Sequence, residues 1–220
     1  MKINYLLPGI SILLFAITLS ADEMTLQPNG DEGKDAWVWS FEPAREINFG
    51  VENDSNLGLH NVLRAEVWKW GGKEESDTIR GLLSFDLSAI PSNASVVEAK
   101  LSLYFYSNPG YTPQLGNNEF LIQRIIEDWS EEKVTWENQP STTAHNQITV
   151  PASNTIDQDY IGLDVRNLVQ ELVYFPQKNH GFMLRLKSEV EFNGVTFASS
   201  EHTDSSKRPR LYIKYITYDK

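Results

Sequence analysis

The residues best suited to ligand chemistry lie on one short alternating segment. One of its faces carries Leu63, Ala65 and Val67, and the other carries Arg64, Glu66, Trp68 and Trp70. Successive residues of a β-strand face opposite sides, so the pattern predicts an apolar face and a polar face that holds two indole rings. An indole offers an apolar surface for the C–H face of a sugar, and charged groups bind sugar hydroxyls. We therefore expect Trp68 and Trp70 to form a carbohydrate-binding platform.

Basic side chains close to these rings complete the predicted site. Arg64, Lys69 and Lys73 are the expected contacts to sugar hydroxyl or carboxylate groups. The alternative is that a helix or loop covers the two indoles, in which case they belong to the core. Trp37 and Trp39 form a second aromatic group, together with Phe41 on the same strand face. We interpret that face as core by its burial preference, and keep the two tryptophans as secondary candidates for glycan contact.

Three acidic residues lie together on a glycine-rich segment near the start of the chain. Asp31, Glu32 and Asp35 offer carboxylate oxygens, which are the ligands that Ca²⁺ prefers. Their spacing differs from that of an EF-hand loop, so a hydrated acidic turn is the competing interpretation. A structural Ca²⁺ is the one cofactor that the sequence suggests.

Catalytic motifs are missing from the sequence. Its four histidines form no HExxH pair, and without cysteine they cannot complete a common zinc site. No GxSxG segment, P-loop or dinucleotide fingerprint occurs. With 30 acidic residues, any chosen glycosidase pair would be arbitrary. We therefore expect a protein without enzymatic activity.

Short alternating segments recur along the chain, and turn sequences such as Asn108-Pro-Gly110 and Asn193-Gly194 separate them. The expected strands lie near 36–41, 58–70, 79–86, 94–106, 119–127, 147–150, 160–163, 180–188, 192–199 and 209–217. Many short strands of this kind predict an all-β fold, a single β-sandwich of jelly-roll type. One segment has helical spacing instead and predicts a short helix over 165–174, with Asp164 as N-cap and Pro176 as its end.

The first residues have the pattern of a secretory signal peptide. Lys2 precedes a short apolar run that ends in the small residues Ser20 and Ala21, after either of which cleavage is expected. The run is shorter than a membrane span. The division is then a signal peptide at 1–21 and one sandwich domain at 22–220. The net charge of −11 disfavours nucleic acid and anionic membranes as partners.

Seven segments of the chain, in this order, are similar to those of a known extracellular family. They are Asn48–Gly50 (NFG), Arg80–Pro91 (RGLLSFDLSAIP), 99–104 (AKLSLY), Glu127–Glu131 (EDWSE), Val134–Pro140 (VTWENQP), Asn179–Phe182 (NHGF) and Arg208–Tyr215 (RPRLYIKY). Their order and spacing resemble the DNRLRE-domain family, also called carbohydrate-binding module family 96. The six-letter string that names the family is absent here. The resemblance implies a secreted, non-catalytic β-sandwich that binds polysaccharide.

The expected function is therefore polysaccharide binding by an aromatic platform, outside the cell, at its surface or in the periplasm. Two other functions remain open. One is a polysaccharide lyase or hydrolase on the same fold, and the other is a structural or adhesion domain of the cell surface. The platform tryptophans without a nameable acid–base set favour the binding module.

Overall fold

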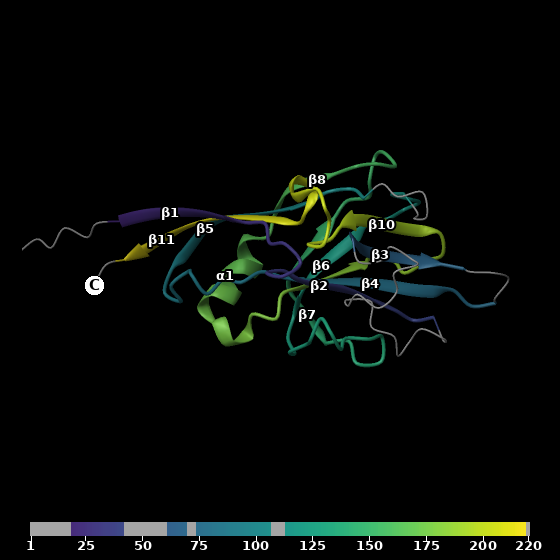
Figure 1. Ribbon diagram of the computed structural model, residues 1–220, viewed down its shortest axis with the longest axis horizontal. Coiled ribbons are helices and arrows are strands. Elements are labelled where there is room, and N and C mark those ends of the chain that lie inside the picture. Colours follow the sequence, from purple (N-terminus) through teal and green to yellow (C-terminus); the bar gives the residue numbers. More distant parts are fainter. Residues whose placement is uncertain (1–18, 42–60, 70–73, 107–112, 219–220) are drawn as a thin grey trace, which may run out of the picture.

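The computed structural model describes residues 19–41, 61–69, 74–106 and 113–218 (Figure 1). Within these residues the strands are β1 (Leu19–Leu26), β2 (Lys34–Trp39), β3 (Val62–Trp68), β4 (Asp77–Ser84), β5 (Ser95–Leu103), β6 (Phe120–Ile125), β7 (Thr142–Val150), β8 (Tyr160–Asp164), β9 (Phe182–Leu186), β10 (Asn193–Ala198) and β11 (Arg210–Tyr218). A single α-helix is described, α1 (Arg166–Tyr174), and two short 3₁₀ turns are η3 (Pro176–Lys178) and η4 (Ser205–Lys207).

The strands form two antiparallel sheets that pack face to face. The four-stranded sheet has the order β1-β11-β5-β8, and the seven-stranded sheet has the order β10-β3-β4-β9-β6-β7, with β2 added through β4 (Figure 1). Most neighbours are distant in sequence, as Greek-key connections require. The prediction of an all-β sandwich is therefore confirmed.

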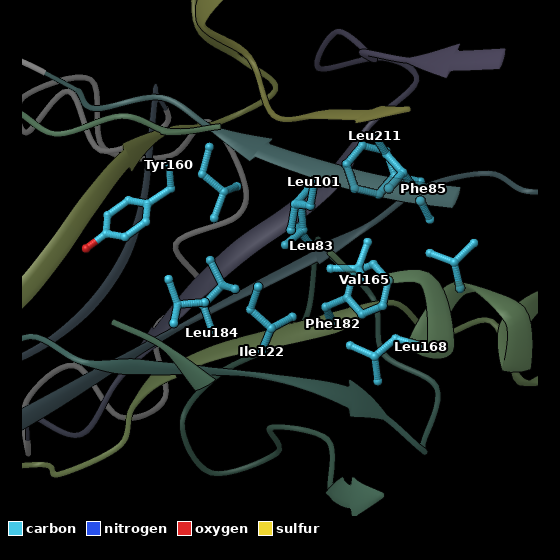
Figure 2. Packing of buried hydrophobic residues seen from close by; sticks show 14 of the residues in the cluster. Leu83, Phe85, Leu101, Ile122, Tyr160, Val165, Leu168, Phe182, Leu184 and Leu211 are labelled. Atoms are coloured by element: carbon cyan, nitrogen blue, oxygen red, sulfur yellow. The ribbon is translucent and has the colours of Figure 1, made fainter. Parts of the chain in front are cut away.

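The core fills the space between the two sheets and is closed on one side by α1. Leu101 and Leu211 of the four-stranded sheet face Leu83, Ile122 and Leu184 of the seven-stranded sheet (Figure 2). All five are at most 2% exposed. The alternation of apolar residues at Ala99, Leu101 and Leu103 of β5 and at Leu211 and Ile213 of β11 places one side of each strand in this core. Burial of a leucine side chain contributes about 1.5–3 kcal/mol.

The predicted helix over 165–174 is confirmed, with a different start. Its buried side chains are Leu168, Val169, Leu172 and Val173. Val165, rather than Asp164, occupies the N-cap position, while the Asp164 carboxylate accepts a hydrogen bond of 3.1 Å from the Arg166 amide. The Arg166 amide has no acceptor within the helix, because it lies in the first turn. Asp164, the residue before the N-cap, supplies that acceptor.

A second, smaller core lies against the seven-stranded sheet. The connection between β6 and β7 contributes Trp129 and Val134, which pack with Leu82 and Met183. The Trp129 indole donates a hydrogen bond of 2.8 Å to the carbonyl oxygen of His180. This layer explains why both faces of β2 are buried, because Ala36 and Val38 join the same cluster.

The strand β1 is absent from the sequence prediction. It pairs with β11 from Leu19 onward, so the expected cleavage positions Ser20 and Ala21 lie within its first residues. The apolar run of the expected signal peptide lies mostly outside the described residues. Among the described residues, no helix has the length and apolar character needed to cross a bilayer.

Candidate functional site

Trp68 stands at the end of β3, half-buried, and meets an aromatic partner from the neighbouring strand. Its ring packs edge-to-face against Phe192, with ring centroids 5.2 Å apart and an interplanar angle of 89°. Phe192 directly precedes β10, which pairs with β3 (Figure 1), and it is 48% exposed. We call these two residues the Trp68–Phe192 pair. Trp70 and Lys73, the other predicted members of the platform, lie outside the described residues.

Phe192 has an uncommon backbone conformation. Its φ of 63° lies in the left-handed region, which bulky residues rarely adopt. The side chain of the next residue, Asn193, stabilises the turn that contains Phe192. It accepts a hydrogen bond from the Asn117 amide and donates one to the Val190 carbonyl oxygen. Sequence analysis placed a turn at Asn193-Gly194, but these residues begin β10 and the turn lies just before them, at Glu191 and Phe192. Sequence analysis also missed Phe192 as a site residue. The signal that could have found Phe192 is an aromatic residue directly before the Asn-Gly sequence.

Polar groups lie beside the Trp68–Phe192 pair. The Lys69 ammonium is 3.9 Å from a Glu191 carboxylate oxygen, and Glu191 also accepts a hydrogen bond from the Ser76 hydroxyl. Lys69 and Glu191 have side chains that are 33% and 37% exposed. They can therefore contact water and, equally, the hydroxyl groups of a ligand.

Arg64 does not have the exposure that the alternation predicted. It is 4% exposed and forms a buried ion pair with Glu66, which is fully buried. Its guanidinium group lies over the Trp37 ring, 5.6 Å from the ring centroid. The expectation of an exposed polar face at this position is wrong, because a charged pair can be buried when its two members bond each other.

Trp37 belongs to the core and Trp39 lies at its margin. Trp37 is 2% exposed and packs with Val62 and Ile79, which confirms the interpretation of this face as core. Burial also removes Trp37 from direct glycan contact. Trp39 is half-buried and stacks on Phe41, with centroids 4.7 Å apart.

A group of three carboxylates gathers around Asp35. Oxygens of Asp35, Glu131 and Glu201 all lie within 4.8 Å of one another. The three residues come from β2, from the β6–β7 connection and from the segment after β10. The expected trio of Asp31, Glu32 and Asp35 is therefore not the group that the fold brings together. Asp31 and Glu32 are exposed, on a turn organised by Asn29.

Burial dominates the electrostatics of this carboxylate group. Desolvation, with the nearby Glu201 charge, holds the pKa of Asp35 well above its usual range, although Asp35 accepts a hydrogen bond of 2.8 Å from the Ser200 amide. Desolvation also raises the pKa of Glu131 to about 7. The Glu131 carboxylate in turn accepts a hydrogen bond of 2.8 Å from the Asp35 amide. Converging like charges of this kind favour a retained proton or a bound cation.

The chemistry of the three donors fits a hard cation. All three offer carboxylate oxygens, as Ca²⁺ sites do, and none offers nitrogen or sulfur. Asp35 is 6% exposed, and Glu131 and Glu201 are partly buried. The arrangement therefore suits a structural role better than attack on a glycosidic bond.

The comparison with known proteins identifies a family. The model of a family described as carbohydrate-binding module family 96 matches residues 31–215. The match runs from the turn before β2 into the last strand, and so includes the seven-stranded sheet, α1 and every strand of the four-stranded sheet except β1. No curated protein matches the chain.

Proposed function

Since the chain belongs to carbohydrate-binding module family 96, we propose that it is an exported, non-catalytic module that binds polysaccharide through an aromatic platform. The Trp68–Phe192 pair forms the platform within the described residues. Trp70 and Lys73 remain predicted members of the same site. Arg64 is omitted as a direct contact because it is buried, and Lys69 is kept.

The observation that carries this proposal is the exposure of two aromatic rings held at right angles. Phe192 is 48% exposed and contacts the half-buried Trp68, so the pair presents apolar area to solvent. Sugar rings have apolar C–H faces that can pack on such rings, and Lys69 and Glu191 can bind the hydroxyl groups around them. The edge-to-face contact fixes both rings before ligand arrives, which reduces the entropic cost of binding.

The two other functions have less support. A polysaccharide lyase or hydrolase needs accessible catalytic groups, and no member of this carboxylate group is freely exposed: Asp35 is buried, and Glu131 and Glu201 are partly buried. An adhesion domain needs an apolar surface that fits a protein. The Trp68–Phe192 pair could provide one, so protein adhesion is the second candidate function, and a binding assay separates the two.

A glycan array with the parent protein and three variants tests the proposal. Trp68→Ala and Phe192→Ala should each remove about 1–3 kcal/mol of binding free energy, by analogy with stacking of nucleic-acid bases on aromatic side chains. Phe175→Ala is the matched control, because Phe175 is an equally exposed phenylalanine, 48%, at the end of α1. Wild-type binding by both platform variants would place the site elsewhere. Release of sugar products by the parent would support the enzyme, and absence of binding would support adhesion.

We further propose that Asp35, Glu131 and Glu201 hold a structural Ca²⁺ that joins β2 to the β6–β7 connection. The support is the convergence of three carboxylates from separate segments. Ca²⁺ should raise the melting temperature of the parent at pH 8 relative to the same protein in EDTA. Glu131→Gln should remove this increase, whereas Asp31→Asn on the exposed turn should keep it. An equal increase in both variants would contradict the assignment.

A further inference from the structure

A groove lies between β1 and the connection from β4 to β5. Its larger part has a volume of about 590 Å³, with Met24 and Leu26 of β1 on one side and Phe85 and Asp86 of the connection on the other. A smaller part of about 340 Å³ continues toward α1. Both parts are lined by Glu32, Phe85 and Asp86, so they form one continuous groove, which we call the β1 groove.

The walls of the β1 groove are apolar, and they differ in kind from the Trp68–Phe192 pair. Met24 and Leu26 are partly buried and pack against the main core, to which Phe85 also belongs. Phe85 is the only aromatic residue among the described residues that line the groove, and it is 4% exposed. A sugar therefore finds no open ring face here, whereas the volume is that of a typical ligand site.

Two exposed carboxylates, Glu32 and Asp86, lie where the two parts of the groove meet. Neither forms an ion pair with a basic residue in the part of the chain that the structure describes. The Ser88 amide donates a hydrogen bond of 2.9 Å to Asp86, which lowers the pKa of that carboxyl group and keeps it ionised. Lys34 lines the smaller part, but its ammonium is 3.8 Å from Asp128. The negative charge of the groove therefore favours a cationic ligand.

The strand β1 leaves one of its edges open beside the groove. It is the outermost strand of the four-stranded sheet and pairs with β11 (Figure 1), and no other described strand pairs with it. Alternate residues of such an edge strand direct their N–H and C=O groups away from the sheet, where an extended peptide can pair with them. Met24, Thr25 and Leu26 line the groove, so one ligand can reach both this edge and the apolar walls.

We propose that the β1 groove binds an extended, basic peptide segment of a partner protein. The peptide backbone adds a strand at the open edge of β1, and its apolar side chains pack against Met24 and Leu26. A lysine or arginine of the peptide binds the carboxylates of Glu32 and Asp86. Because side chains of a strand alternate between two faces, a peptide with alternating basic and apolar residues suits the groove best. This protein-binding surface does not depend on the proposed glycan site.

The test uses a labelled peptide of alternating lysine and valine residues with blocked ends, and fluorescence anisotropy measures its binding to the parent protein. A matched peptide with glutamate in place of lysine should bind at least about tenfold more weakly, because its charges repel the groove. Two further peptides are N-methylated, one at its lysines and one at its valines. Only one of them should lose affinity, because alternate amides of a strand face the same edge.

Variants of the protein locate the binding. Asp86→Asn and Glu32→Gln should each weaken binding of the lysine peptide about tenfold, the loss expected for a hydrogen bond to a charged group. Asparagine at position 86 keeps an oxygen that can accept the Ser88 bond, so the melting temperature should match the parent. Asp157→Asn, at an exposed carboxylate between β7 and β8, is the matched control and should bind normally. Trp68→Ala should also bind the peptide normally, because Trp68 does not line the groove.

Four results would overturn the proposal. The parent fails to bind the lysine peptide, or Asp157→Asn weakens binding as much as Asp86→Asn does, which would mean that the overall acidity of the protein attracts the peptide. N-acetyl-lysine amide binds as tightly as the peptide, which would assign the groove to a free amine. The parent self-associates in sedimentation experiments and Asp86→Asn does not, without peptide binding, which would assign the groove to a second copy. None of these results affects the glycan test of the Trp68–Phe192 pair.

Discussion

Gly81 of β4 lies directly against Leu63 of β3. A Cβ atom at position 81 would be 2.9 Å from the Leu63 Cδ1 atom and 2.9 Å from the Arg64 carbonyl oxygen. One of these neighbours is backbone, which cannot turn aside as the end of a flexible side chain can. The two strands are neighbours in the seven-stranded sheet, and this close approach continues beyond their last paired residues, Glu66 and Ile79.

Gly81→Ala should therefore destabilise the sandwich. An added methyl group in a close-packed site costs about 1–3 kcal/mol, and urea unfolding measures it. Gly162→Ala is an instructive comparison, since no atom lies within 4 Å of its Cβ position and its cost arises only from a φ of 71°. Equal stability of Gly81→Ala and the parent would contradict the close approach.

Phe192→Asn should separate backbone strain from binding. Asparagine adopts the left-handed region more readily than phenylalanine, so the free energy of unfolding should be unchanged or slightly increased. Glycan binding should decrease, because the aromatic partner of Trp68 is lost. Thermal unfolding and a titration with the best ligand of the array measure the two effects. A parallel loss of stability and binding would indicate that the side chain is structural.

The carboxylate group should make stability depend on pH. The folded-state pKa of Glu131 is about 7 against an ordinary value of 4.5, and that of Asp35 is also raised. The unfolded chain therefore releases these protons at lower pH than the folded chain does. Their contribution to stability is complete below about pH 4.5 and is lost as the pH rises to about 7.

Glu131→Gln should flatten this pH profile, while Glu132→Gln, at the exposed neighbouring position, should not. Urea unfolding at pH 5 and pH 8, both in EDTA, gives the comparison. Ca²⁺ should restore stability mainly at pH 8, because it binds the ionised carboxylates. A profile that is the same in Glu131→Gln and the parent would show that Glu131 does not titrate with a raised pKa.

Leu172→Ala should test whether α1 is an integral part of the core. Leu172 is 1% exposed in the main cluster, and truncation of a buried leucine costs about 2–5 kcal/mol. Asn167→Ala, on the exposed side of the same helix, should change stability by less than about 0.5 kcal/mol. Comparable effects of the two substitutions would mean that the helix contributes little to the core.

Local pattern was sufficient wherever a residue's neighbours in sequence decide its environment. The alternation through Leu101 and Leu103 predicted β5, and the 3.6-residue spacing through Leu168 and Leu172 predicted α1. Both are confirmed because a strand or helix turns every second residue, or every third and fourth, toward the same side. The ordered segments also indicated the family that residues 31–215 match.

The tertiary structure alone decided which residues meet across the chain. Alternation separates Arg64 from Leu63 but cannot show that both sides of β3 are covered, with Trp37 from another strand beneath the guanidinium group. Asp35 likewise finds its carboxylate neighbours in Glu131 and Glu201, far along the sequence, and not in the adjacent acidic turn. Such contacts depend on the pairing of distant strands, and a periodic pattern contains no information about its partner.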